Sequence, residues 1–351
     1  MAKSGRKVSI ISRENDYKSL DIRLIEKELV KRGIEVETLT RRLTKDISLR
    51  NLGYLGHIAR QIKSIAGSKV VLIDTYCIPI SMLPVSKKTT VIQMWHALGA
   101  IKKFGWQTVG KKNGTRKEIA GLMRMHRGYD EVLASSDVTA KFFCEAFDCT
   151  EDKIVKIGLP RIDYILQKNT EVEESIYKQY PVLKKKKNIL YAPTFRGGKA
   201  VDTESLTGAV DFSKYNLVVK LHPIDKLRTE KIDKPGIIYD DIYDTYDMLK
   251  VADIIISDYS AFVIEASLAQ KPLYLYTYDE EDYRETTGLN VNLSEEAIGK
   301  YSFSKAKDLL KEIEKDYDYE ALAEFRNKYI DIDTNNCTKQ LADHIEEILD
   351  S

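Results

Sequence analysis

Two histidines each follow a short apolar run with the composition of a buried β-strand, a position from which polar side chains commonly face a ligand. His96 lies in VIQMWHALG (residues 91–99) and His222 lies in LVVKLHP (residues 217–223). An imidazole titrates near neutral pH and can accept a proton from an attacking hydroxyl. Position alone leaves a structural role equally open, but the same arrangement in two of only five histidines favours catalysis. The other three fall in helix or loop patterns and are expected to be structural: His57, His126 and His344.

Two further clusters at strand ends have side chains suited to phosphate. In DIIISDYSAFVIEA (residues 253–266) an apolar run turns directly into a helix pattern, and the free N–H groups of a helix start attract phosphate oxygens. Simple capping of that helix is the alternative for its polar residues. Glu265 is expected either to reach ribose hydroxyls or to complement the helix dipole. In NILYAPTFRGG (residues 188–198) an arginine offers a planar fork for phosphate, and two glycines let the backbone approach closely. The residues predicted to bind a phosphorylated donor are Thr194, Arg196, Lys220, Ser257, Asp258, Ser260 and Glu265.

The segment from residue 100 to residue 127 has eight basic residues and a single acidic one, Glu118, interleaved with bulky apolar side chains. This composition suits the surface of an anionic bilayer, and it would also suit a polyanionic acceptor. A solvated cationic loop beside a buried helix is the plain alternative. The residues predicted to make the membrane or acceptor contact are Lys102, Lys103, Lys111, Lys112, Arg116 and Lys117.

Short strand-like runs alternate with helix patterns along most of the chain, which predicts an α/β protein with two doubly wound parallel sheets. The expected strands are 8–12, 36–39, 70–73, 91–94, 131–134 and 154–157 in the first half, and 188–192, 217–220, 236–239, 253–257 and 272–276 in the second. The expected helices are 19–32, 246–251 and 260–270, with polar-rich helices over 304–350.

The polar stretch 167–187 is interpreted as the connection between the halves, which gives domains at residues 1–170 and 171–330. The remaining residues, 331–351, are expected to form a C-terminal helix that packs back on the first domain. Ligands of such sheets bind at the carboxyl ends of the strands, so a cleft between the two domains is the expected site.

Composition excludes several classes of protein. Lys and Arg total 55 against 54 Asp and Glu, so no overall charge favours nucleic acid. The four cysteines lack CxxC spacing, and no Walker or GxGxxG loop is present. No apolar run reaches the length of a membrane span, so we expect a cytoplasmic protein. No cofactor is implied; Asp258 leaves a divalent metal open, but no paired-acid cluster accompanies it.

Four motifs taken together, WHALGAIKKFG, YAPTFRGG, KLHP and SDYSAFVIEASLAQKPLYLYTYD, resemble the CDP-glycerol glycerophosphotransferase family of teichoic acid synthesis. The resemblance runs from about Thr90 to Leu289. It implies a GT-B fold with the two domains facing across a cleft. It also implies transfer of a polyol phosphate, glycerol before ribitol, from a CDP-polyol to a lipid-linked saccharide or teichoic acid chain. CMP would leave at the inner face of the membrane, where the protein would be peripheral.

The resemblance also implies roles for individual residues. His96 matches the proposed general base, and His222 matches the histidine beside the donor pyrophosphate, which gives an acceptor-side first domain and a donor-binding second domain. Ala261 stands where the family often has serine, and Ala97 stands where glycine is common. Two other readings stay open: a GT-B glycosyltransferase using a nucleotide sugar, and a non-catalytic protein that binds membrane or teichoic acid. The strand-end histidines His96 and His222 favour an enzyme that handles two phosphates, and so the phosphotransferase interpretation.

Overall fold

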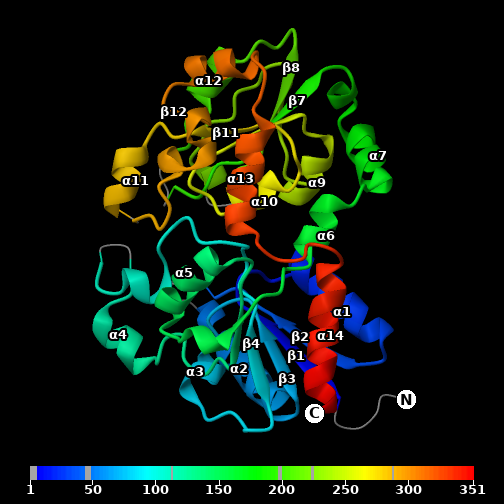
Figure 1. Ribbon diagram of the computed structural model, residues 1–351, viewed down its shortest axis with the longest axis vertical. Helices are drawn as coiled ribbons and strands as arrows, with labels where there is room; N and C mark the ends of the chain where they lie inside the picture. The colour runs from blue at the N-terminus through cyan, green and yellow to red at the C-terminus, as the bar shows by residue number, and fades with distance from the viewer. Residues whose placement is uncertain (1–5, 44–48, 112–113, 197–199, 223–224, 287) are drawn as a thin grey trace. The chain divides into compact units, whose positions relative to one another are not determined.

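The computed structural model describes residues 6–43, 49–111, 114–196, 200–222, 225–286 and 288–351 (Figure 1). The chain forms two compact units. Residues 1–163 and 329–351 make up the first unit, and residues 164–328 make up the second. The predicted domain boundaries were 170/171 and 330/331. Two helices, α6 (Arg161–Leu166) and α13 (Tyr319–Tyr329), span the points where the chain passes between units.

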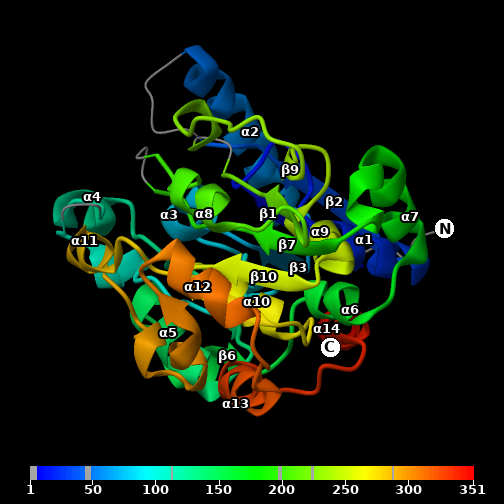
Figure 2. The same cartoon turned by 90° about the horizontal axis from the view of Figure 1, so that it is seen from above.

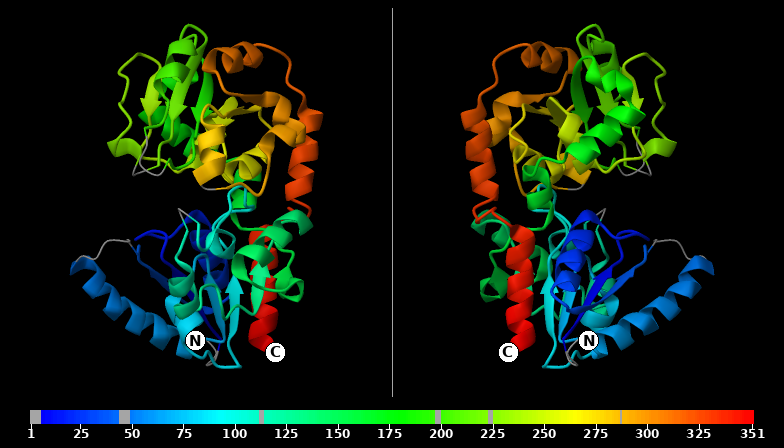
Figure 3. Two further views of the ribbon diagram at one scale, coloured as in Figure 1. Left: turned by 90° about the vertical axis from the view of Figure 1, so that its left-hand side faces the viewer. Right: turned by 90° about the vertical axis from the view of Figure 1, so that its right-hand side faces the viewer.

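The first unit is built on a six-stranded, entirely parallel sheet in the order β2-β1-β3-β4-β5-β6. One of its two central strands is β3, where Val70, Val71, Leu72 and Ile73 are all fully buried because helices cover both faces of the sheet. Figure 3 shows α2 on one face and the C-terminal helix α14 on the other. The strands are β1 (Lys7–Ser12), β2 (Glu35–Thr40), β3 (Val70–Ile73), β4 (Thr90–Gln93), β5 (Glu131–Leu133) and β6 (Ile154–Val155). The helices are α1 (Leu20–Lys31), α2 (Leu49–Ala66), α3 (Ile78–Met82), η1 (Gly105–Thr108), α4 (Lys117–Leu122), α5 (Asp137–Phe147), η2 (Glu151–Lys153) and α14 (Cys337–Asp350).

Helix α14 packs alongside α1 (Figure 1). Its N-cap residue, Asn336, has a left-handed backbone and no side-chain cap. The carboxylate of Asp163 accepts hydrogen bonds from the backbone N–H groups of Cys337 at 2.7 Å and Thr338 at 2.8 Å. Two donors that would otherwise be unsatisfied at this helix start are therefore bound by a side chain distant in sequence.

The second unit is built on another six-stranded parallel sheet, in the order β12-β11-β10-β7-β8-β9. Read from β9, this is the 3-2-1-4-5-6 order of dinucleotide-binding folds. Helix α7 packs beside α9, and α8 packs beside α12 (Figure 2). The strands are β7 (Lys187–Tyr191), β8 (Tyr215–Val219), β9 (Ile237–Tyr239), β10 (Ile254–Ser257), β11 (Leu273–Tyr276) and β12 (Ser302–Phe303). The helices are α7 (Thr170–Gln179), η3 (Pro181–Lys184), α8 (Glu204–Ala209), η4 (Asp225–Leu227), α9 (Thr245–Val251), α10 (Phe262–Ser267), α11 (Glu280–Thr286), η5 (Leu293–Glu295), η6 (Ala297–Tyr301) and α12 (Ala306–Ile313).

Every strand predicted from the apolar runs is present, with bounds within two residues of those expected. Two expectations differ from the structure in detail, and one strand was missed. The stretch 167–187, interpreted as the connection between the halves, belongs to the second unit, where α7 begins after the Asn169 cap and Ile176 is fully buried. The helix expected over 260–270 is limited to α10, and Gln270 has a left-handed backbone. The two-residue strand β12 was missed because so short a run has no periodicity.

Candidate active site

His96 lies three residues beyond the end of β4, on the same edge of the first sheet as the end of β3. Its Nδ1 is 3.0 Å from the backbone oxygen of Asp74, the residue that follows β3. A carbonyl oxygen can only accept, so in the neutral imidazole this contact places the proton on Nδ1 and leaves the lone pair on Nε2. The half-buried side chain of His96 is thus oriented as a base.

A cluster of aromatic rings packs against the His96 ring. The Trp95 ring lies 4.0 Å from the His96 ring, stacks on Phe104 at 4.5 Å, and meets Phe147 of α5 edge-on at 5.2 Å. Trp95 has a left-handed backbone, with φ of 58°. The strained position in the WHA motif is therefore Trp95, and Ala97 has no positive φ, which explains why alanine is tolerated there.

Asp74 is an acidic residue at this site that the sequence analysis missed. Its carboxyl is buried, and burial raises its pKa to about 6, against the opposing effect of the nearby His96 imidazole and the hydroxyls of Ser12 and Thr75. Asp74 follows a buried strand directly, the same pattern that drew attention to the histidines, so this signal could have found it. A buried acid beside an imidazole is a common feature of sites that move protons.

In the second unit, His222 follows β8 and its ring lies 4.7 Å from the ring of Phe195. The side chain is half-buried. Asp225 lies close by: burial raises the pKa of its carboxyl, and the charges of His222 and Arg196 oppose that rise. Of the polar groups at the strand ends in the second unit, this imidazole is well suited to contact a phosphate. The neighbouring Pro223 lies outside the described residues.

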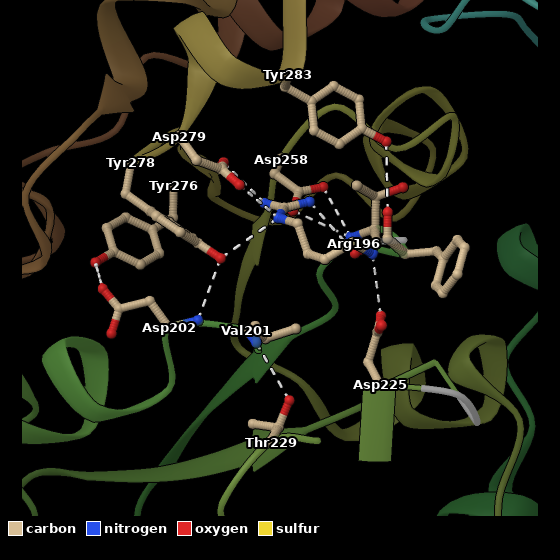
Figure 4. A network of polar contacts seen from close by, with 12 residues as sticks. Arg196, Val201, Asp202, Asp225, Thr229, Asp258, Tyr276, Tyr278, Asp279 and Tyr283 are labelled. Atoms are coloured by element: carbon tan, nitrogen blue, oxygen red, sulfur yellow. Dashed lines mark hydrogen bonds and ion pairs between the residues drawn. The ribbon is translucent and has the colours of Figure 1, made fainter. Parts of the chain in front are cut away.

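Arg196, predicted to offer a planar fork to phosphate, is paired with two carboxylates of the protein. Its side chain is 2% exposed, and its guanidinium is bound by Asp258 at 2.7 Å and Asp279 at 2.8 Å (Figure 4). Burial disfavours the charge, but Asp258, Tyr278 and Asp279 together raise the pKa of Arg196 above its ordinary value. The ring of Tyr283 lies 5.4 Å from the guanidinium carbon. Arg196 therefore joins the loops that follow β7, β10 and β11, and Asp279 is the partner that sequence reasoning missed.

The other predicted donor residues also make internal contacts that fix the loops. Asp258 accepts from the backbone N–H of Thr194 at 2.9 Å, and Ser257 Oγ donates to the Ala192 carbonyl at 2.7 Å. Both carboxylate oxygens of Asp258 bind Thr194, so Asp258 does not resemble an open metal ligand. No group of three or more His, Cys, Asp or Glu side chains able to hold a metal occurs within the residues that the structure describes.

Lys220 and Glu265 are also engaged by the protein. Lys220 Nζ lies 2.7 Å from Asp240 and also donates to the Tyr243 carbonyl, and the buried Glu265 accepts from Tyr246. Ser260 is half-buried, with Oγ accepting from the Phe262 N–H at 3.3 Å. Of the predicted donor residues, Ser260 and Lys220 are partly exposed, and Lys220 is paired with Asp240. The predicted catalytic residue His222 is also partly exposed.

The basic segment forms η1 and α4. Lys111, Arg116 and Lys117 are exposed, Lys102 and Lys103 are half-buried, and Lys112 lies outside the described residues. Helix α4 is not the buried helix of the plain alternative: Leu122 is 74% exposed, Ile119 is 39% exposed, and Ala120 is its buried residue. In the described parts of the chain, no helix has the length and apolar composition needed to cross a bilayer.

The sequence matches the model of the CDP-Glycerol:Poly(glycerophosphate) glycerophosphotransferase family over residues 4–347. The chain belongs to this family. It is 31% identical to the teichoic acid ribitol-phosphate primase of Bacillus spizizenii, a match that covers 98% of this chain and 92% of that protein. It is 29% identical to the teichoic acid glycerol-phosphate primase of Bacillus subtilis, over 84% of this chain and 77% of that protein. The structure of the wall teichoic acid polymerase TagF superposes with a TM-score of 0.77 at 18% identity, covering 98% of this chain and 89% of that one.

These findings confirm three predictions. The family suggested by the four motifs is correct, and the match reaches far beyond the segment that carried the resemblance. The likeness to TagF confirms an α/β fold of GT-B type. The chain is therefore a phosphotransferase of the CDP-polyol class, as predicted, and neither a nucleotide-sugar glycosyltransferase nor a non-catalytic binding protein is supported.

Proposed function

We propose that the protein primes teichoic acid synthesis by transferring one polyol phosphate from a CDP-polyol to a hydroxyl of a lipid-linked saccharide acceptor. A priming step is supported because each of the two primases matches this chain over most of its own length and most of the length of this chain. The motifs alone favoured glycerol. Because a ribitol-phosphate primase matches 98% of this chain, CDP-ribitol stands beside CDP-glycerol as a candidate donor.

The observation that carries the mechanism is the contact between His96 Nδ1 and the Asp74 carbonyl. With Nδ1 protonated, Nε2 takes the proton of the acceptor hydroxyl as its oxygen attacks the phosphorus that bears the polyol. The new bond joins the acceptor oxygen to this phosphorus, and the bond from phosphorus to the bridging oxygen of CMP breaks. CMP leaves with that electron pair, and charge on the departing phosphate must be neutralised.

On the donor side, we infer that His222 and Ser260 contact the pyrophosphate. Both lie at carboxyl ends of strands, and Ser260 follows β10, which pairs with β7 where the strand order reverses. Ligands of doubly wound sheets bind at this reversal. Arg196, Asp258, Thr194, Lys220, Ser257 and Glu265 are proposed to hold the surrounding loops in place.

A single set of assays tests this proposal. Purified protein is incubated with radiolabelled CDP-glycerol, CDP-ribitol or a nucleotide sugar and a lipid-linked acceptor analogue, and both free nucleotide and product length are measured. We expect CMP release and a one-unit product from one CDP-polyol. Long polymers would contradict the priming step, and turnover of a nucleotide sugar would contradict the donor class.

The same assay tests the histidine. His96→Ala should lower transfer by about 100-fold or more while CDP-polyol binding is retained, because a positioned general base typically contributes 10²–10⁴-fold. His344→Ala is the matched control, since His344 pairs with Glu131 at 2.6 Å and lies outside the proposed site. Near-normal turnover by the His96 variant would overturn the assignment.

We further propose that α4 contacts an anionic membrane surface. Its exposed Leu122 and Ile119 lie beside the exposed Arg116 and Lys117, and each basic residue near such a surface contributes about 1 kcal/mol. Leu122→Gln and Lys117→Gln should each reduce cosedimentation with phosphatidylglycerol vesicles more than with phosphatidylcholine vesicles. Ile242→Gln is the control: it is 62% exposed but lies among aspartates. Equal binding by all variants would contradict this contact.

A further inference from the structure

The amide of Gln93, the last residue of β4, joins the two loops that hold His96. Gln93 is fully buried. Its Oε1 accepts from the backbone N–H of Trp95 at 2.9 Å, and its Nε2 donates to the carbonyl of Thr75 at 3.2 Å. Both ends of the amide are therefore used, one on the loop after β4 and the other on the loop after β3.

These contacts form a closed ring with the histidine. From Gln93 Oε1 the ring passes to Trp95 N–H and along the chain to His96, whose Nδ1 bonds the Asp74 carbonyl. From Asp74 one peptide bond leads to Thr75, whose carbonyl returns to Gln93 Nε2. Two consecutive carbonyls of one loop thus bind the imidazole and the amide, so displacement of either loop alters the direction of Nε2.

The ring also stabilises a strained turn. Trp95 is left-handed, with φ of 58°, a conformation that costs a bulky residue about 1–2 kcal/mol. It persists where surrounding groups fix it, and here Gln93 binds its N–H while Phe104 stacks on its ring at 4.5 Å. Without the Oε1 of the fully buried Gln93, the backbone N–H of Trp95 would lose its hydrogen-bond acceptor, and an unsatisfied donor at a buried position is destabilising.

We propose that Gln93 is a positioning residue for the transfer reaction, which aims His96 Nε2 at the acceptor hydroxyl without touching substrate itself. This inference rests on the proposed role of His96 as the base. The chemistry requires a side chain that donates and accepts in one plane, which an amide supplies and a methionine or ionised carboxylate does not.

The test compares Gln93→Met, which at similar volume removes both hydrogen bonds to the loops and the hydrogen bond with the Tyr129 hydroxyl, with Gln93→Glu, which keeps the acceptor and loses the amide donor. We expect kcat of the methionine variant to fall roughly 10–100-fold, because a displacement of about 1 Å at a reacting group costs up to 10²-fold. KM for the CDP-polyol should stay within about twofold, since the donor loops belong to the other unit. Gln93→Glu should recover part of the lost kcat. Gln61→Met is the matched control, a buried glutamine of α2 in the same unit.

A double variant separates this inference from the proposed function. If His96→Ala keeps normal turnover, the proposed function fails. If His96→Ala is inactive and folded Gln93 variants keep kcat within twofold of the parent, the role of Gln93 fails. In the His96→Ala background, Gln93→Met should cause no further loss of residual activity, because both changes remove the same oriented base. Multiplying losses, or equal loss of kcat in Gln61→Met, would also overturn the inference. Circular dichroism and thermal melting verify folding, and Gln93→Glu decides the matter if Gln93→Met does not fold.

Discussion

His96 and Arg196 both follow strand-like runs in the sequence, but they have different partners in the folded protein. The imidazole of His96 meets a backbone carbonyl and keeps a nitrogen lone pair for chemistry. The guanidinium of Arg196 meets two carboxylates, and this neutralises it. The difference depends on residues far along the chain, since Asp279 is 83 positions from Arg196.

Substitution of Arg196 separates a positioning role from phosphate binding. Arg196→Gln leaves Asp258 and Asp279 without their counter-charge, and breaking a buried pair in this way costs about 3–5 kcal/mol. We expect a large fall in the free energy of unfolding in urea. Arg196→Lys keeps the charge but loses the fork, so its loss should be smaller. Unchanged stability with a raised KM for the CDP-polyol would instead identify Arg196 as a phosphate ligand.

Among the elements, the strands were the most predictable part of the chain. Runs such as VVLI at β3 are buried on both faces of a parallel sheet and are recognisable without any knowledge of their neighbours. Helix α7 was missed because its sequence, TEVEESIYKQ, has one fully buried residue, Ile176, and reads as polar linker. The position of Asp74 was as visible as that of His96, but an aspartate after a strand is a weaker signal than a histidine repeated in both halves.

For the candidate site, the sequence indicated which loops carry polar side chains but not which partners those side chains have. The residues predicted from the sequence lie in the loops that follow β4, β7, β8 and β10. Sequence reasoning could not distinguish groups that face substrate from groups that hold the loops, because that depends on pairings such as Lys220 with Asp240. Such pairs form between loops that only the folded sheet brings together.

The cap of α14 gives a prediction at the scale of one helix. Asp163→Ala removes the acceptor for the Cys337 and Thr338 N–H groups, which should lower the stability of the first unit by about 1–2 kcal/mol. Asp163→Asn should cost less, because one amide oxygen still accepts. Asp343→Asn is the control on the exposed face of α14, where its pair with Arg32 contributes about 0–1 kcal/mol. Equal thermal melting of the Asp163→Ala and Asp343→Asn variants would contradict the cap.

For the molecule as a whole, acid should unfold the first unit through a buried histidine. Burial lowers the pKa of His126 to about 3 from an ordinary value near 6.5, so the folded state holds it neutral, with Nδ1 2.9 Å from the Tyr129 hydroxyl. Below about pH 6.5, His126 binds a proton in the unfolded chain but stays neutral in the folded chain. The free energy of unfolding should therefore fall by about 1.4 kcal/mol per pH unit from there towards pH 3.

Urea titrations between pH 7.5 and pH 4 measure this dependence. His126→Asn is the informative variant, because asparagine tolerates the left-handed backbone at this position, where φ is 60°. It should flatten the acid slope relative to the parent protein. An unchanged slope would show that other groups control acid unfolding.

Assignment of the last helix to the first unit has a consequence for how the protein is made. During synthesis, residues 1–163 leave the ribosome before residues 329–351 are made. Helix α1 can therefore contact α14 only after the whole of the second unit has emerged. Until then Asp163 has no helix start to cap, and the face of the sheet that α14 covers stays exposed to the cell. The nascent chain is therefore most in need of chaperones while its second unit is still being translated.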